Sequence, residues 1–423
     1  MKKAKLALFL GLALVLAVAF ALPGCAPEEA APPAIEKIVI GHPVCLSGKY
    51  AKAGEQALGG IKGIIKWVNE VYGGVEVAGA KVPLEYKYYD CESAKETVTS
   101  LIERLITVDK VDFVIAPYSS GLTLAGAPVA EKYNMIYMDH GGASDRIFEQ
   151  GYEYVVQTIG PGTRYHVGTL DMIHQIDPAA KRVALAYEDD EFSRMVMAGA
   201  KEHATELGFD IVFERTYPGG VTDLTPLLSD LKTTNPDIVL GGGHYEDGML
   251  FNRQMADLDI DVKALSLVAS ATLPAFGEAL GEMAEGVMGP SHWEYGVTYS
   301  SEGAEVAGLD WIGPSQDEFV ALFQEALGKP EMIPDYHAAE AGAAILALVK
   351  AVEMADSVDS DEVRAALGDL EFMSFYGIWD VDETGLQVGH SMVDMQWQGG
   401  ERVIIWPPEA KTGELVYPKP DFP

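Results

Sequence analysis

Short runs rich in β-branched and aromatic residues alternate with longer stretches whose apolar residues recur every three or four positions. In the first part of the chain the strand-like runs are IEKIVIGHPV, VPLEYKYYD, FVIAPY and MIYMDH. The helix-like stretches between them are GGIKGIIKWVNEVYGG, AKETVTSLIERLITVD and SSGLTLAGAPVAEKYN. Because strands that alternate with helices build parallel sheets covered on both faces, this part predicts an α/β fold with a doubly wound sheet.

The same alternation resumes after Gly160. RVALAYEDD, FDIVFERTYP, PDIVLGGGH and VKALSLV have the composition of strands, and a helix is predicted from about Phe192 to Leu207. A long helix, YHAAEAGAAILALVKAVEMA, comes later, and the closing segments GIWDVDETG and SMVDMQWQGGERVIIWP have the pattern of antiparallel strands. The whole pattern predicts two similar α/β lobes that one chain crosses several times, with a cleft between them.

The N-terminus has the features of an export signal rather than of a folded element. Three lysines precede an uninterrupted apolar run from Leu6 to Ala21, which predicts a signal peptide over residues 1–24, with a membrane anchor as the alternative. The run ends in LPGC, which resembles the bacterial lipobox and implies a lipid-modified Cys25 after cleavage. Residues 25–34 are rich in Pro, Ala and Glu and predict an extended tether. A multiply acylated cysteine would hold the protein stably at a membrane.

The net charge limits the classes of molecule that the protein can bind. The 423 residues carry a formal net charge of -34, and removal of the signal would make the protein still more acidic. Such a surface repels nucleic acid and anionic membrane. The hydrophobic fraction of 48% supports large buried cores. We find no cluster of His or Cys with the spacing of metal ligands and no cofactor motif, so the sequence predicts neither a metal nor a cofactor.

The stretch GHPVCLSGKYAKAG, Gly41 to Gly54, has the outline of a phosphate-binding loop. A P-loop needs two glycines separated by four residues and then Lys followed by Ser or Thr. Here six residues separate Gly41 from Gly48, and Tyr50 follows Lys49. Since Tyr cannot replace the small metal-binding hydroxyl, we interpret the stretch as the turn from a first strand to a first helix. Gly48 permits the turn, and Lys49 is predicted to be solvated at the rim.

Two cysteines remain after the predicted lipidation site. Cys45 follows the first predicted strand and Cys91 follows the second, so the two meet if those strands are neighbours. In an oxidising compartment a disulfide is then plausible. Two buried free thiols are the alternative, because sequence does not fix the geometry that a disulfide needs.

From about Ile35 onward the chain resembles a known family. The matching stretches include IVIGHPVCLSGKYAKAG, VDFVIAPYSSG, GYEYVVQTIGP, DIVLGGGHYEDG, AEGVMG and MQWQGGERVIIWP. Their order and spacing resemble the leucine/isoleucine/valine-binding (branched-chain amino acid) family of type I solute-binding proteins of ABC transporters. The resemblance implies the type I periplasmic-binding-protein fold, with two lobes joined by a multi-strand hinge. Lobe 1 is expected over residues 35–158 and 291–391, and lobe 2 over residues 159–290 and 392–423.

In an open α/β sheet, ligands bind in the crevice outside the carboxyl ends of the strands. APYSSG places Ser119 and Ser120 where a strand becomes a helix, and hydroxyl and backbone N–H groups there suit a carboxylate. The resemblance implies that they bind the ligand's carboxylate; a plain helix N-cap is the alternative. It also implies contacts from the loop MDHGGASD, through Gly141 and Ala143, with Ser144 replacing an expected Thr.

Lobe 2 and several aromatic residues complete the predicted site. By resemblance Phe192 covers the ligand, and His244 or the adjacent Tyr245 ends a strand at the cleft. Tyr118 and Tyr336 are further candidates, as is Trp293. For each of these side chains, packing in the core or on a helix face is the alternative.

One position departs from the family pattern. The family's amino acid binders carry an acid in lobe 2 that pairs with the ligand ammonium, and the corresponding residue here is Ala269. Asp189, Glu191 or Glu246 could supply the missing charge from nearby loops. Otherwise the ligand lacks an α-ammonium, because a buried ammonium without a partner is costly. The ligand class therefore stays open among amino acids, other carboxylates and amides.

The sequence thus predicts a lipid-anchored solute-binding protein that closes on a small polar ligand and delivers it to the permease of an ABC transporter. A ligand-sensing module of the same fold is an alternative, although no signalling domain accompanies it. An exported enzyme is a third. Neither G-x-S-x-G nor H-E-x-x-H occurs, and no credible pair of Cys nucleophile and His base is seen, so we predict no enzymatic activity.

Overall fold

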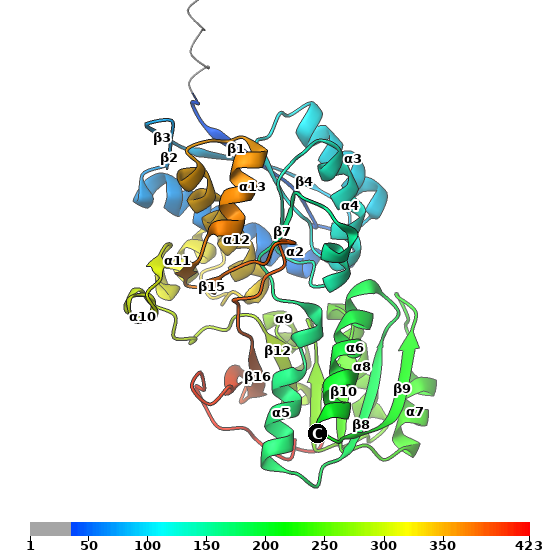
Figure 1. Ribbon diagram of the computed structural model, residues 1–423. Helices are drawn as coiled ribbons and strands as arrows, with labels where there is room; N and C mark the ends of the chain where they lie inside the picture. The colour runs from blue at the N-terminus through cyan, green and yellow to red at the C-terminus, as the bar shows by residue number, and fades with distance from the viewer. Residues whose placement is uncertain (1–34) are drawn as a thin grey trace, which may run out of the picture. The chain divides into compact units, whose positions relative to one another are not determined.

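The computed structural model describes residues 35–423, and Figure 1 shows its ribbon. The predicted signal peptide, Cys25 and the tether lie outside the described residues. Residues Glu36–Pro423 form one compact unit. Among the helices in this part of the chain, none combines the length and apolar character that crossing a membrane requires.

The first sheet has five strands, all parallel, in the order β4-β1-β5-β6-β7. Side chains of β1 alternate between two helical layers. Ile38 and Ile40 face Leu348 and other residues of the long helix α12, whereas Val39 joins the apolar cluster formed with α3 and α4. Helices thus cover both faces of the sheet, as predicted for a doubly wound fold. The strands are β1 (Ile38–Val44), β4 (Leu84–Asp90), β5 (Phe113–Ile115), β6 (Tyr137–Asp139) and β7 (Val155–Gln157), and the helices between them are α2 (Ala51–Trp67), α3 (Lys95–Thr107) and α4 (Ser120–Lys132).

The second sheet repeats this strand order. Five parallel strands run β9-β8-β10-β11-β12, and β16 and β17 extend the sheet in antiparallel fashion, as the closing segments predicted. The strands are β8 (Arg182–Glu188), β9 (Asp210–Tyr217), β10 (Ile238–Gly242), β11 (Ala264–Leu267), β12 (Met288–Ser291), β16 (Val393–Gln398) and β17 (Glu401–Trp406). The accompanying helices are α5 (Val167–Ile176), α6 (Glu191–Glu206), α7 (Thr225–Thr233), α8 (Tyr245–Asp257) and α9 (Pro274–Leu280).

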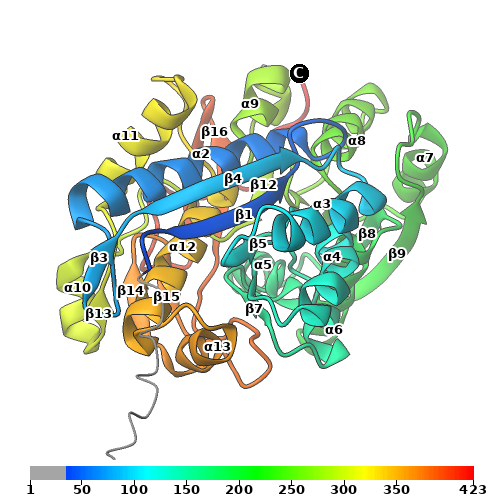
Figure 2. The same ribbon diagram turned by 90° about the horizontal axis from the view of Figure 1, so that it is seen from above.

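The chain passes between the two sheets after β7, after β12 and before β16. Elements between the last two passages pack on the first sheet, and Figure 2 shows α2 close to α11 and α12. The order of elements agrees with the predicted multi-strand hinge, while the exact lobe boundaries stay a prediction. The elements of this insertion are α10 (Ser301–Ala307), β13 (Asp310–Trp311), α11 (Gln316–Leu327), α12 (Tyr336–Ala355), α13 (Ser360–Asp369), β14 (Phe372–Ser374) and β15 (Gly377–Trp379). Four short helical segments, Val68–Tyr72, Asp145–Gln150, Gly162–Arg164 and Gly281–Ala284, and the hairpin of β2 (Val75–Val77) and β3 (Ala80–Val82) complete the described chain.

Helix α2 begins earlier than the glycine-rich sequence suggested, at Ala51 instead of near Gly59. The glycines serve close packing instead of ending the helix. A side chain at Gly54 would overlap the carbonyl of Cys45, and one at Gly60 would overlap the carbonyl of Ala338 in α12. Only the predicted stop after Tyr72 behaves as a turn, because Gly73 there adopts φ 88°.

The two cysteines meet as their positions predicted. Strands β1 and β4 are neighbours, and Val44 pairs with Asp90, so Cys45 and Cys91 leave the sheet side by side. Both side chains are buried, and their sulfur atoms lie 2.9 Å apart. The disulfide itself stays a prediction.

Candidate ligand-binding site

The repeated strand order fixes where a site can form. In each sheet the first strand has its second and third strands on opposite sides, so a crevice opens where β1 meets β5 and where β8 meets β10. The loops after these strands and after β6, together with the first turns of α4, α6 and α12, carry the residues singled out in the sequence. All nine are buried: Tyr118, Ser119, Ser120, Gly141, Ala143, Ser144, Phe192, His244 and Tyr336.

On the lobe 1 side, the loops after β5 and β6 are joined. Ser119 is the N-cap of α4, and its hydroxyl makes no capping hydrogen bond, so it is not committed to the helix. The hydroxyl oxygen of Ser120 accepts a hydrogen bond from the Ser144 N–H at 3.1 Å. Gly141 must be small, because a Cβ there would lie 2.8 Å from the ring of Tyr118. Backbone and hydroxyl groups of both loops thus converge at the N-terminus of α4.

A buried carboxylate shapes the second of these loops. The Asp139 Oδ1 atom accepts hydrogen bonds from the N–H groups of Gly141 at 3.2 Å and Gly142 at 2.6 Å. Burial raises the pKa of Asp139 to about 8, although these N–H groups oppose the shift. Ala143 is held differently, since its carbonyl accepts the N–H of Gly162 at the passage to lobe 2. The loop is therefore fixed by its own polar groups before any ligand arrives.

Aromatic side chains line the boundary between the lobes. Phe192 lies 5.4 Å from His244 and 5.3 Å from Tyr165 between ring centroids. Tyr336, the first residue of α12, stacks on His337 at 4.0 Å, and His337 meets Tyr118 edge to face at 4.9 Å. The predicted residues Tyr118, Phe192, His244 and Tyr336 therefore belong to one connected set of rings, to which Tyr165 and His337 are additions that the sequence did not indicate.

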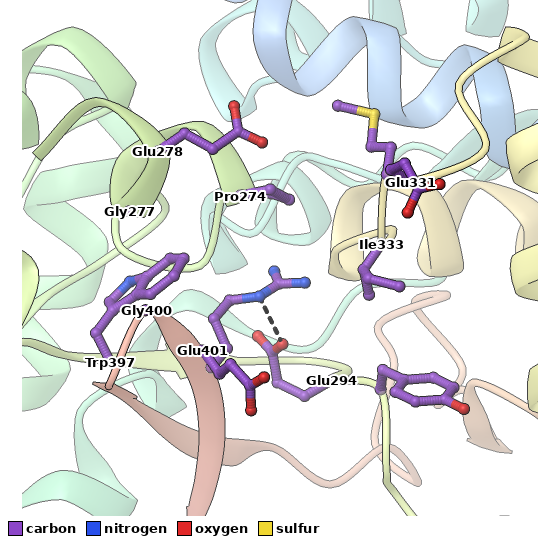
Figure 3. Close-up of a pocket in the computed structure, with 12 residues that line it drawn as sticks. Pro274, Gly277, Glu278, Glu294, Glu331, Ile333, Trp397, Gly400 and Glu401 are labelled. Carbon is purple, nitrogen blue, oxygen red and sulfur yellow. Dashed lines mark ion pairs between the residues drawn. The ribbon is translucent and has the colours of Figure 1, made fainter. Parts of the chain in front are cut away.

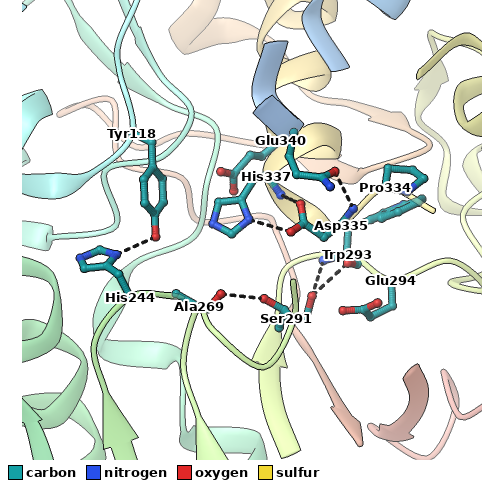
Figure 4. Close-up of polar contacts among 12 residues, drawn as sticks. Tyr118, His244, Ala269, Ser291, Trp293, Glu294, Pro334, Asp335, His337 and Glu340 are labelled. Atoms are coloured by element: carbon teal, nitrogen blue, oxygen red, sulfur yellow. Dashed lines mark hydrogen bonds and ion pairs between the residues drawn. The ribbon is translucent and has the colours of Figure 1, made fainter. Parts of the chain in front are cut away.

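One hydrogen-bonded chain crosses from lobe 1 to lobe 2. The Tyr118 hydroxyl lies 3.0 Å from Nδ1 of His244, and Nε2 of the same ring lies 2.8 Å from Oδ2 of Asp190 (Figure 4 draws the first contact). Burial favours a raised pKa for Asp190, but the charge of a protonated His244 and its hydrogen bond hold that pKa below the usual range. His244, predicted as one possible cleft residue, is thus the lobe 2 partner of Tyr118.

Lys49 corrects a prediction. Its ammonium is not simply solvated at the rim: it pairs with Glu188 and lies 3.6 Å from Oδ2 of Asp247, both in lobe 2. The side chains of Glu188 and Asp247 are 4% and 5% exposed, so this is a largely buried contact. Sequence analysis missed it because Glu188 is 139 positions away in the chain.

The fold also assembles a group of potential metal ligands that spacing along the sequence did not suggest. Glu188, Asp190 and His244 each bring one ligand atom within 4.8 Å of the others. However, Lys49 already pairs with Glu188, and both ring nitrogens of His244 have hydrogen-bond partners. Because an ammonium supplies the positive charge at this point, we interpret the group as part of the contact between lobes.

A groove of about 530 Å³ opens elsewhere at the boundary of the lobes, between α9, the loop before α12 and the β16–β17 hairpin (Figure 3). Exposed carboxylates of Glu278, Glu331 and Glu401 line it. Arg402 pairs with the buried Glu294 at 3.4 Å and donates to the carbonyl of Pro334 at 3.0 Å. None of the predicted ligand contacts lies here, and Arg402 instead ties the hairpin to lobe 1.

Comparison with known proteins identifies the family. A family model described as periplasmic binding protein matches residues 37–401, most of the chain. The chain belongs to the periplasmic binding protein family. The resemblance to the leucine/isoleucine/valine-binding type and the type I fold inferred from the sequence are thereby confirmed. This is a family of solute-binding proteins rather than of enzymes.

Curated and solved relatives support the assignment. The Leu/Ile/Val-binding protein homolog 7 of Brucella melitensis is 25% identical over 418 residues, covering 96% of this chain and 99% of its own. A branched-chain amino acid transporter substrate binding protein of Streptococcus pneumoniae, solved with isoleucine, superposes with a TM-score of 0.74 at 19% identity, over 90% of this chain and 100% of its own. A solute binding protein of R. palustris, solved with benzoate, gives a TM-score of 0.71 at 19% identity, over 91% and 97% of the two chains.

In this periplasmic binding protein the expected lobe 2 acid is absent at its usual place. Ala269 is buried and left-handed, with φ 55°, and its carbonyl accepts the Thr272 hydroxyl at 3.3 Å. Two of the acids considered as substitutes point elsewhere: Asp189 is 44% exposed and pairs with Arg194, and Glu246 is exposed. Glu191 does reach the predicted site, because its Oε1 accepts the Ser144 hydroxyl at 2.9 Å, but its Oε2 is already paired with Arg146 at 2.9 Å.

Sequence reasoning missed a different acid, Glu340. It lies in α12 one turn after Tyr336 and is completely buried. A signal for it exists in the sequence: YHAAEAGAAILALV contains a single carboxylate within an otherwise apolar helix that packs on all sides. Glu340 was overlooked because the whole helix was interpreted as part of the core.

Proposed function

We propose that this periplasmic binding protein captures a small carboxylate-bearing ligand, such as an amino acid, between its lobes and delivers it to an ABC permease. The observation that carries the proposal is the convergence at the N-terminus of α4. Ser119, whose hydroxyl makes no capping hydrogen bond to the helix, lies there. So do the two loops that the hydrogen bond between Ser120 and Ser144 joins, beside the ring set that links both lobes. The N–H groups and hydroxyls at a helix N-terminus suit a carboxylate, and the rings suit the apolar remainder of the ligand.

Contacts between lobes support a closing mechanism. Tyr118 and Lys49 of lobe 1 bind His244, Glu188 and Asp247 of lobe 2, so closure forms polar contacts that opening would break. Because the described chain passes between the sheets at three points, a hinge there can rotate one lobe against the other. A ligand bound in the cleft thus favours the closed form, and the closed form is the one that a permease would recognise.

A thermal-shift screen tests ligand capture. The probes are single amino acids, benzoate and 4-hydroxybenzoate, short fatty acids and amides at millimolar concentration, applied to residues 36–423, the compact unit. A ligand with micromolar affinity should stabilise the protein by roughly 4 kcal/mol. The same ligand should reduce the radius of gyration in small-angle scattering. Failure of the whole panel to change either quantity would reject the proposal.

The anchor is a separate part of the proposal. Cys25 is the residue proposed to carry the acyl chains that hold the exported protein at the outer face of the cytoplasmic membrane or in the periplasm. Mass spectrometry of the mature N-terminus tests it directly. In a Cys25→Ser variant the protein should move from the membrane fraction to the soluble fraction, and unchanged fractionation would contradict the anchor.

Delivery to a permease is tested by reconstitution with candidate ABC transporters from the same organism. Ligand-loaded protein should stimulate ATP hydrolysis by the transporter, and a Ser119→Ala variant with weakened ligand binding should need more ligand for the same rate. Ligand binding without any effect on the transporter would favour the sensing alternative instead.

A further inference from the structure

Glu340 is a buried acid that the described chain does not satisfy. Both carboxylate oxygens lack a hydrogen-bond partner within residues 35–423. The ring of His140 approaches it without a hydrogen bond, with Nδ1 3.5 Å from Oε1. Both nitrogens of His140 and Nε2 of His337 also have no partner in the same part of the chain. Since buried polar groups are nearly always hydrogen-bonded, these atoms require a polar group from outside the chain.

The surroundings of Glu340 are aromatic. Burial raises the pKa values of four tyrosine hydroxyls near Glu340, and the charge of Glu340 contributes to each of these shifts. These tyrosines are Tyr118, Tyr165, Tyr336 and Tyr376. No lysine or arginine of residues 35–423 pairs with the carboxylate. Burial raises the pKa of Glu340 well above its usual range, so the acid without a cation resists ionisation. A positively charged nitrogen placed beside it would supply the missing partner charge.

Glu340 belongs to the same site as the predicted ligand contacts. Figure 4 shows its carboxylate beside the ring of His337, on the side of Tyr118, with His244 and Ala269 across from them in lobe 2. Tyr118 itself bonds to His244. The acid therefore approaches the boundary of the lobes from lobe 1, opposite the position where the family's acid is replaced by Ala269.

We propose that Glu340 binds the charged nitrogen of the ligand, and that the ligand is a primary amine as well as a carboxylate. This rests on the proposed function. The ammonium N–H groups donate to Oε1 and Oε2 of Glu340. One ring nitrogen of His140 and Nε2 of His337 accept further N–H groups or bridge to them through water. Glu340 of helix α12 in lobe 1 thus supplies the negative charge that the family carries in lobe 2, at the position of Ala269.

Matched probes that differ only in the amine test the proposal without any variant. L-Leucine is compared with 4-methylpentanoate, and L-phenylalanine with 3-phenylpropionate, by calorimetry on the wild-type protein. The amine of at least one pair should bind on the order of 10- to 100-fold more tightly than its deaminated partner. Equal or tighter binding of the deaminated partners, or of benzoate alone, would overturn the role of Glu340 while leaving ligand capture intact.

A substitution then assigns the effect to this residue. Glu340→Gln should lose most of the affinity for the amine but keep its affinity for the deaminated partner, and its unfolding temperature without ligand should not fall, because an unpaired buried acid is removed. Glu305→Gln, an exposed change in α10, is the matched control and should bind as wild type does. Unchanged amine binding in Glu340→Gln overturns the proposal. Should no compound of the whole thermal-shift panel bind the wild type, the proposed function fails as well.

Discussion

The ion pair between Lys49 and lobe 2 gives a quantitative test of closure. Replacing Lys49 by Met keeps the length of the side chain and removes its charge. In the closed form, Glu188 and Asp247 would then remain 4% and 5% exposed without the ammonium. In an open form both carboxylates would be hydrated. The substitution should therefore disfavour closure specifically.

The size of this effect follows from the geometry. At 3.6 Å and an effective dielectric constant of about 20, the attraction between Lys49 and Asp247 is roughly 5 kcal/mol before solvation is counted. Breaking a buried pair typically costs about 3–5 kcal/mol. Because the Lys49 side chain is 28% exposed, we discount this to about 2 kcal/mol. That shift weakens the apparent affinity for a ligand that needs closure by roughly 30-fold.

Two measurements check the value. Small-angle scattering without ligand should give a larger radius of gyration for Lys49→Met than for wild type, and calorimetry with the strongest ligand of the screen should give the weaker affinity. Lys52→Met, an exposed lysine one position into α2, is the control and should behave as wild type. If Lys49→Met matches the control in both measurements, the contact does not hold the lobes together and the reasoning is refuted.

Three further predictions concern stability and are read from urea unfolding of the same compact unit. Gly60→Ala should destabilise the protein by about 3 kcal/mol, because the new Cβ overlaps a carbonyl of α12. Gly121→Ala is the control: its Cβ meets nothing nearer than 3.8 Å, so this variant should be neutral or gain up to about 1 kcal/mol of stability. Equal losses of stability in the two variants would contradict this reasoning. The pKa of Asp139 is about 8 in the folded state and about 4 in the unfolded state. Its contribution to stability is therefore fully present below about pH 4 and is lost as the pH rises through about 8. Between those pH values the free energy of unfolding of Asp139→Asn should rise relative to that of wild type by up to about 1.4 kcal/mol per pH unit. A difference in stability that does not change with pH would show that this carboxyl does not titrate as inferred. Oxidation of Cys45 and Cys91, 46 positions apart, should add about 4 kcal/mol that a reductant removes; identical curves with and without reductant, or two reactive thiols in the exported protein, would favour free cysteines.

The fold could be predicted because its determinants are local. Alternating strand-like and helix-like segments require only side-chain spacing, and that spacing survives in β1 and in α12, whose bounds Tyr336–Ala355 equal the predicted stretch. The start of α2 was missed for a non-local reason. Gly54 and Gly60 resemble helix breakers in sequence, yet each meets a backbone carbonyl from a distant part of the chain. Tertiary packing overrides their low helix propensity.

The site divides in the same way. Residues at strand ends, such as Ser119 and His244, were found because the carboxyl ends of parallel strands share one edge. Lys49 was misjudged and Glu340 was overlooked, since the role of each depends on what another segment places beside it. No spacing rule relates Lys49 to Glu188, and periodicity alone treats every position of α12 as core.

Helix α12 also joins two places that are far apart. Its first turns carry Tyr336, His337 and Glu340, while its C-cap residue Asp356 accepts the N–H of Ala78 in the β2–β3 hairpin. Twenty helical residues span about 30 Å, and most of this length is buried. Because the packed helix is held along its length, the residues that face lobe 2 and the hairpin on the far side of lobe 1 are parts of one rigid element. The position of the acid at the cleft is therefore fixed by the interior of lobe 1.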